Sequence, residues 1–266
     1  MDDPFEDSPP ELPGAIAMPV AHIKVHAEPR ISAKQLAEYL VSDQSRQRAI
    51  IKESKFAKTV MVVPYKKVRS SIPHAFSRDC LDIDSLGKRA NEIEMENNQP
   101  DVSQWFQKDN TNSAAALRHL CSIAPNLTWK NARVLHLRFP ALVIAGVTVS
   151  VCPEVAFSFE HKQIAKVGGI ILNTAQSEDK SLARDNGSFQ MGQYLAALLF
   201  NMLLAHASKI GVPLHTHCYA VDIFRESVYT APPGYRRLNK NIEAACEFIA
   251  SLWPKIEYRT SVPDAK

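Results

Sequence analysis

The order of periodic apolar segments in the second half of the chain constrains the fold more than any other feature. Several short runs rich in β-branched residues come first, and an amphipathic helical stripe, further strands and a last helix follow. The strand-like runs are 132–139, 141–151, 155–159, 166–173, 218–224 and 227–229, and the helical stripes are 189–208 and 241–253. Neighbouring strands followed by a helix, rather than regular alternation, predict a mixed α/β (α+β) central sheet flanked by helices.

Residues 1–30 are expected to be an acidic, disordered tail. The first thirteen residues carry five acids, four prolines and no lysine or arginine. Such a stretch cannot bury enough apolar surface to offset the entropy of ordering it. The tail would bind a partner, shield a basic face or simply remain solvated.

Order is predicted to begin at Ser32, because the run Ser32 to Gln35 forms a capping box. Ser42 or Asp43 would cap a second helix, and Ser113 would cap a later one. We therefore divide the ordered chain into an N-terminal helical extension with a polar insertion, 31–112, and an α/β core domain, 113–266.

The clearest sign of nucleic-acid binding is a basic region between Arg46 and Arg69. It holds eight basic residues against one acid, Glu53, which gives a net charge of +7. Clustered cations neutralise phosphates and release counterions. The predicted contacts to DNA or RNA are Arg46, Arg48, Lys52, Lys55, Lys66, Lys67 and Arg69. The alternative is a solvated basic face that balances the acidic tail. Thr59 to Tyr65, within this region, is expected to be a strand.

Bulk composition indicates a soluble, cytoplasmic protein without a membrane span. Hydrophobic residues make up 45% of the 266 and the net charge is only +3. No apolar run reaches the length of a membrane helix, and the acidic start does not read as a signal peptide. The five cysteines form no CxxC motif and are expected to be reduced, mostly buried thiols.

A metal-dependent nuclease site is one interpretation of the acids around the third strand-like run. Glu154 ends one apolar run, and Glu160-His161-Lys162 follows at the end of the next. Carboxylates hold Mg²⁺ and a lysine can stabilise charge on a phosphoryl group. We therefore take Glu154, Glu160 and Lys162 as candidate catalytic residues, with Glu154 and Glu160 as the metal ligands.

The segment order helix–strand–strand–strand–helix–strand, with Pro153-Glu154 and Glu160-His161-Lys162, is similar to the PD-(D/E)XK nuclease-like superfamily. The stretch 147–253 also resembles a bacterial protein family with that fold, chiefly in 149–154, 168–172 and 220–224. The resemblance implies a PD-(D/E)XK-like core and Mg²⁺-dependent cleavage of nucleic acid.

This chain departs from the superfamily pattern in ways that favour an inactive member. Glutamate stands at 154 where aspartate is usual, and Glu154 and Glu160 are closer in sequence than the two motifs normally are. The run 169–172 is apolar where an acid and a lysine are expected. The sequence thus predicts a nucleic-acid-binding protein with a divergent nuclease-like core. The alternative is a non-catalytic protein-interaction or regulatory module of a bacterial system.

Two further polar features have structural explanations that we favour. His215 and His217 alternate on a strand and would bind Zn²⁺ only with ligands that the sequence does not place nearby. Asp222 lies in an apolar run and needs a partner when buried; we expect structural pairing with Arg225, Arg236 or Arg237 rather than catalysis.

Overall fold

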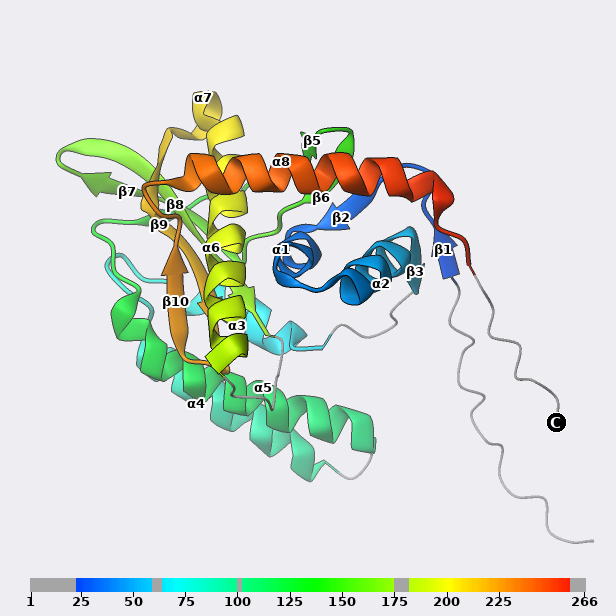
Figure 1. Ribbon diagram of the computed structural model, residues 1–266. Coiled ribbons are helices and arrows are strands. Elements are labelled where there is room, and N and C mark those ends of the chain that lie inside the picture. The colour runs from blue at the N-terminus through cyan, green and yellow to red at the C-terminus, as the bar shows by residue number, and fades with distance from the viewer. Residues whose placement is uncertain (1–22, 59–63, 100–101, 175–181, 259–266) are drawn as a thin grey trace, which may run out of the picture.

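The centre of the protein is a five-stranded mixed sheet with strand order β10–β9–β8–β7–β4 (Figure 1). The computed structural model describes residues 23–58, 64–99, 102–174 and 182–258, with the backbone alone for 182–185. β8 and β9 are parallel, and the other neighbouring pairs of this sheet are antiparallel. The strands are β4 (Arg133–Val134), β7 (Val155–His161), β8 (Ile164–Asn173), β9 (Val212–Asp222) and β10 (Ser227–Thr230). The predicted mixed sheet flanked by helices is therefore confirmed.

Helices cover both faces of the sheet, and each face has its own hydrophobic core. Alternation along β8 divides the two cores, because Ile171 joins the first and Ile170 and Leu172 join the second. The first core is completed by α1 (Ala33–Val41), α2 (Gln44–Lys55), α6 (Leu182–Ala205) and α8 (Tyr235–Leu252). The second is completed by α3 (Lys66–Ala75), α4 (Ile83–Met95) and α5 (Gln104–Ile123).

Two small sheets hold the N-terminal part of the described chain. β2 (Arg30–Ser32) pairs in parallel with β6 (Val147–Ser150), which pairs with β5 (Leu142–Ile144). β1 (Ile23–Val25) pairs with β3 (Phe56–Lys58). The expectation of a disordered tail up to residue 30 is thus wrong for 23–30. The indole of Trp253 donates to the carbonyls of His26 and Ala27, 3.1 Å away in each case, so distant contacts order this segment.

The first two helices begin where the sequence predicted. Ser32 caps α1 through the amide of Gln35, and the Gln35 side chain accepts from the amide of Ser32. Asp43 caps α2 by accepting from the amide of Arg46 at 2.9 Å. The strand expected over 59–65 falls mostly outside the described residues, and Tyr65 is the cap of α3.

Helix α5 begins at Gln104, capped by Ser103, so the predicted start at Ser113 is wrong. Ser113 is completely buried within the helix. Apart from Trp105 and Phe106, the first turns of α5 are polar and have no continuous apolar stripe, so no helical periodicity marks them in the sequence. The proposed division between 112 and 113 consequently falls inside a helix, and α1 and α2 share one core with α6 and α8.

Three further segment bounds differ from the prediction. The run 141–151 is a hairpin, because Ala145 and Gly146 adopt positive φ angles of 46° and 79° between β5 and β6. Helix α6 begins at Leu182, seven residues before the apolar stripe that predicted it. The last helix begins at Tyr235, six residues before the apolar stripe that predicted it.

The segment order of the core is α5–β4–β7–β8–α6–β9, with the β5–β6 hairpin inserted into the three-stranded sheet. The remaining short helices are α7 (Ala207–Ile210) and the single turns η1 (Glu96–Asn98), η2 (Ala124–Asn126) and η3 (Trp253–Lys255). Within the described residues, none of the helices combines the length and apolar character that crossing a membrane requires.

Candidate functional site around Glu154

Glu154 places a buried carboxylate at one edge of the central sheet. Its backbone amide donates to the carbonyl of Ile170 at 2.9 Å, which fixes the residue against β8. Oε2 accepts from the amide of Leu172 at 2.8 Å, and Oε1 accepts from a guanidinium nitrogen of Arg69 at 3.0 Å. The side chain is 3% exposed. Burial raises the pKa of this carboxyl, and nearby Lys34, Arg69 and the Leu172 amide oppose the rise.

Two cations from distant parts of the chain face this carboxylate. Arg69 comes from α3 and Lys34 from the first turn of α1. Burial and, after it, the charge of Arg69 lower the pKa of Lys34 to about 8, although Glu154 and Asp222 act in the opposite direction. The Nε atom of Arg69 is buried without a hydrogen-bond partner among the described residues. The carboxylate is therefore neutralised by side chains of the protein itself.

Asp222 ends β9 beside this group and is 5% exposed. Its Oδ2 accepts from Nδ2 of Asn173 at 3.0 Å, and its Oδ1 accepts from the amide of Arg225 at 3.2 Å. Burial raises its pKa, and these hydrogen bonds and the charge of Arg225 oppose the rise. Of the three arginines that the sequence offered as partners, Arg225 is the one in place.

Strand directions explain why these residues meet. Asn173 and Asp222 are register partners at the carboxyl ends of the parallel strands β8 and β9. β7 is antiparallel to β8, so Glu154, just before β7, lies at the same edge. Ligand sites of open α/β sheets lie outside the carboxyl ends of such strands. We refer to Lys34, Arg69, Glu154, Asn173 and Asp222 as the edge cluster.

The predicted catalytic trio is not assembled. Glu160 is near the end of β7 and Lys162 is in the two-residue turn between β7 and β8. Six residue steps of about 3.3 Å separate Glu154 from Glu160, or roughly 20 Å along the strand. The two carboxylates cannot ligate one ion in this arrangement, and both oxygens of Glu154 already have partners. These residues do not fit a shared Mg²⁺ site.

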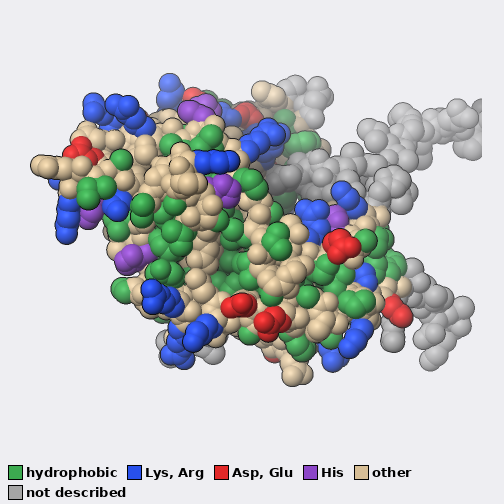
Figure 2. All heavy atoms as spheres, turned by 90° about the horizontal axis from the view of Figure 1, so that it is seen from above, with side chains coloured by type: hydrophobic (Ala, Val, Ile, Leu, Met, Phe, Trp, Pro, Cys, Tyr) green, Lys and Arg blue, Asp and Glu red, His purple; other side chains and the backbone are tan. Residues whose placement is uncertain are grey.

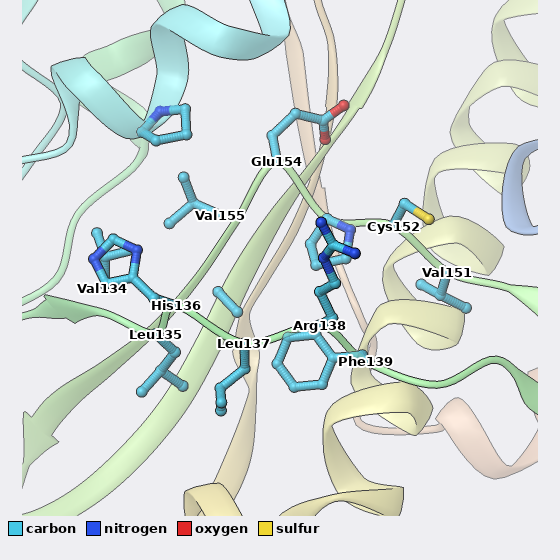
Figure 3. A pocket seen from close by; sticks show the side chains of 13 residues that line it. Val134, Leu135, His136, Leu137, Arg138, Phe139, Val151, Cys152, Glu154 and Val155 are labelled. Atoms are coloured by element: carbon cyan, nitrogen blue, oxygen red, sulfur yellow. The ribbon is translucent and has the colours of Figure 1, made fainter.

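A groove of about 570 Å³ runs between residues 134–139 and 151–156. Figure 3 shows that the carboxylate of Glu154 points away from the groove-lining side chains of His136 and Arg138. The thiol of Cys152 is exposed beside it. The groove therefore borders the backbone of Glu154 without reaching its carboxylate.

The exposure of Cys80 and Cys152 corrects the expectation of mostly buried thiols, which Cys218 and Cys246 satisfy.

The predicted basic region does not form one free surface. Arg46 bridges Glu38 and Glu53, Lys67 pairs with Glu96, and Arg69 pairs with Glu154. The Nζ atom of Lys55 donates to the carbonyls of Trp253 and Ile256, each at 2.7 Å. Lys52 lies 5.7 Å from the ring centre of Tyr258. Arg48 and Lys66 are exposed.

The histidines of β9 have partners that explain them structurally. His215 makes a 2.9 Å hydrogen bond with the carbonyl of Ala231, and His217 stacks on Phe159 with ring centres 4.3 Å apart. Burial and the neighbouring histidines lower the pKa of His217 to about 4. No group of three metal-ligating side chains occurs in the described part of the chain.

Sequence reasoning missed Lys34 and Asn173 as members of the edge cluster. Neither carries a local signal, because Lys34 reads as a polar position of an amphipathic helix and Asn173 as the end of a strand. Only the pairing of β8 with β9 and the packing of α1 against α6 bring them together.

Neither the scan against protein-family models nor the search of curated proteins found a match to this chain. The resemblance to PD-(D/E)XK proteins therefore rests on the residues and the segment order alone.

Proposed function

We propose that the chain is a nucleic-acid-binding protein with a nuclease-like core that does not cut. The observation that carries the proposal is a set of lysines and arginines at one end of the molecule that lack acidic partners. Figure 2 shows several Lys and Arg side chains at the left end, where Figure 1 places the β7–β8 hairpin, and further ones elsewhere on this face. None of Arg78, Arg133, Lys162 or Lys166 forms an ion pair within the described residues. Unpaired cations are available to neutralise phosphates.

Two features support a nuclease-like but non-cutting core. The order α5–β4–β7–β8–α6–β9 is the order that the resemblance to PD-(D/E)XK proteins implies. The acid at the expected position, Glu154, is neutralised by Arg69 and faces Lys34 instead of standing open to a metal. Glu160 and Lys162 lie too far away to complete a catalytic site with it.

The test is to measure binding of the purified protein to duplex and single-stranded DNA and RNA at two salt concentrations, with and without Mg²⁺. We expect affinity that falls steeply with salt, because binding releases counterions, and no cleavage product. A Mg²⁺-dependent product that disappears in Glu154→Gln would show that the core cuts. Absence of binding at low salt would overturn the proposal as a whole.

The alternative of a protein-interaction module is favoured by one observation. Trp105 and Phe106 form an edge-to-face pair at the start of α5 and are 44% and 47% exposed. Exposed aromatic residues are enriched at protein interfaces. This reading would gain if the protein bound no nucleic acid and if alanine at both positions abolished capture of a specific protein partner.

A further inference from the structure

We propose that the phosphate backbone of a nucleic-acid duplex binds in a groove between β4 and the β7–β8 hairpin, and not on the Arg46–Arg69 region. This inference rests on the proposed function, since it names the surface that would carry it. The groove has a volume of about 560 Å³ and is lined in part by Arg78, Asn131, Arg133, Ser158, Glu160 and Gln163. We call it the hairpin groove.

The geometry of the sheet creates this groove. β4 is only two residues long and pairs with Phe157 and Ser158, so the rest of β7 extends past it. On the other side of the hairpin, Lys166 is the first residue paired with β9, and residues 161–165 project beyond both neighbours. Lys162 and Gln163 form the turn with φ angles of 51° and 62°. The hairpin thus stands out as a two-stranded ribbon with a lysine at its tip.

The arginines of the groove lie beside neutral residues. Arg133 lies opposite Ser158 in the register of β4 and β7, and Arg78 donates to the side-chain oxygen of Asn131 at 3.1 Å. A neutral amide fixes the direction of a guanidinium without cancelling its charge. Guanidinium groups match phosphate oxygens with paired N–H donors.

The charge around the groove is positive. The amide of Glu160 donates to the carbonyl of Lys130, which brings Lys130 to the rim. Arg78, Arg133 and Glu160 line the groove. The residues adjacent in sequence to the lining add Lys130, Lys162, Lys166 and Asp79, which brings the net charge of the groove and its surroundings to +3. In the described part of the chain, none of these cations is in an ion pair. These cations are spread over residues 78–166 and form no basic cluster in the sequence.

The aromatic content of the groove favours a duplex over a single strand. Proteins that bind single strands stack bases on exposed aromatic rings. Phe159, the aromatic residue that lines the groove, is 3% exposed and already stacked on His217. Polar side chains such as Asn131, Ser158 and Gln163 are suited to phosphate and sugar, which receive about half or more of protein–DNA hydrogen bonds.

The test compares two double variants of the full chain with equal changes in charge. Arg78→Glu/Arg133→Glu reverses the charge of the two arginines that line the groove. Arg48→Glu/Lys66→Glu reverses the charge of two exposed cations of the Arg46–Arg69 region. Duplex and single-stranded DNA of one length are titrated at several salt concentrations. We expect the groove variant to lose about tenfold or more in duplex affinity and to reduce the salt slope by about 0.9 per lost phosphate contact. The control variant should keep the affinity of the parent, and the parent should prefer duplex.

Different outcomes would overturn the hairpin groove alone or the proposed function as well. Loss of binding in the control variant alone, or equal loss in both variants, would overturn the hairpin groove and leave nucleic-acid binding in place. Preference of the parent for the single strand would also overturn the duplex assignment. A parent that binds neither form of DNA would overturn the hairpin groove, and if it also binds no RNA it would overturn the proposed function. If circular dichroism shows that the glutamate variant is unfolded, Arg78→Gln/Arg133→Gln removes the charge without reversing it, and retained affinity in that variant contradicts the groove.

Discussion

At the scale of single residues, Glu154 shows that a carboxylate in the position of a possible metal ligand can be engaged by the protein itself. It follows a proline at the start of a strand, and its oxygens accept from Arg69 and from the Leu172 amide. A buried ion pair contributes little net stability, but removal of one member leaves an uncompensated charge. The free-energy cost of replacing either side chain should therefore depend on whether the other one is still present.

Arg69→Met should destabilise the protein by about 2–4 kcal/mol, because Glu154 stays buried and, of the two described cations that oppose the rise of its pKa, keeps Lys34 alone. Because Arg69 is itself 34% exposed, solvent already screens part of its interaction with Glu154, which reduces the expected loss of stability. In a Glu154→Gln background the same change should cost clearly less. Urea unfolding of the parent, both single variants and the double variant measures this coupling, and additive losses would show that the two side chains are independent.

At the scale of elements, Lys55 shows that a cation in a basic run can serve the fold. It lies in the last turn of α2 and donates to two carbonyls at and just beyond η3, close to the carboxyl end of α8. Carbonyls at a helix end lack partners within the helix. Its position among the predicted nucleic-acid contacts reflects sequence proximity to other cations.

Lys55→Met should lower the free energy of unfolding by about 1.5–3 kcal/mol, the usual worth of hydrogen bonds from a charged donor. Duplex affinity should remain close to that of the parent. Lys58→Met serves as the control, because Lys58 is exposed at the end of β3 and should change stability little. A large loss of affinity at unchanged stability would restore Lys55 as a nucleic-acid contact.

At the scale of the whole molecule, the two helical layers decide which parts of the chain depend on one another. Leu36, Ile50 and Ile51, from α1 and α2, are completely buried in the same core as residues of α6 and α8. The opposite face of the sheet is covered by α3, α4 and α5. The N-terminal third is thus part of both cores rather than an appendage to one.

A truncated chain of residues 113–266 should therefore fail to fold. It would lack α1 and α2, expose one side of α6 and start in the middle of α5. Far-ultraviolet circular dichroism and limited proteolysis should show little stable structure, with the full chain as the reference. Cooperative unfolding of the fragment would show that the predicted core domain is independent.

The sequence by itself determined the local elements. Ser32 and Asp43 begin helices because their side chains accept from amides three residues ahead, and alternation along β7 and β8 reflects two buried faces. These signals act between near neighbours and need no knowledge of the fold. The mixed sheet could be predicted for the same reason, because it depends on the order of the strands and helices along the chain.

Only the tertiary structure decided the sites. Strand length put Glu160 far from Glu154, and strand pairing put Asn173 beside Asp222. Packing of α1 and α3 brought Lys34 and Arg69 to Glu154, and intramolecular partners engaged the cations Arg46, Lys55 and Lys67. Charge and hydrogen bonding act through space, and the chain brings together residues that are separated by more than a hundred positions.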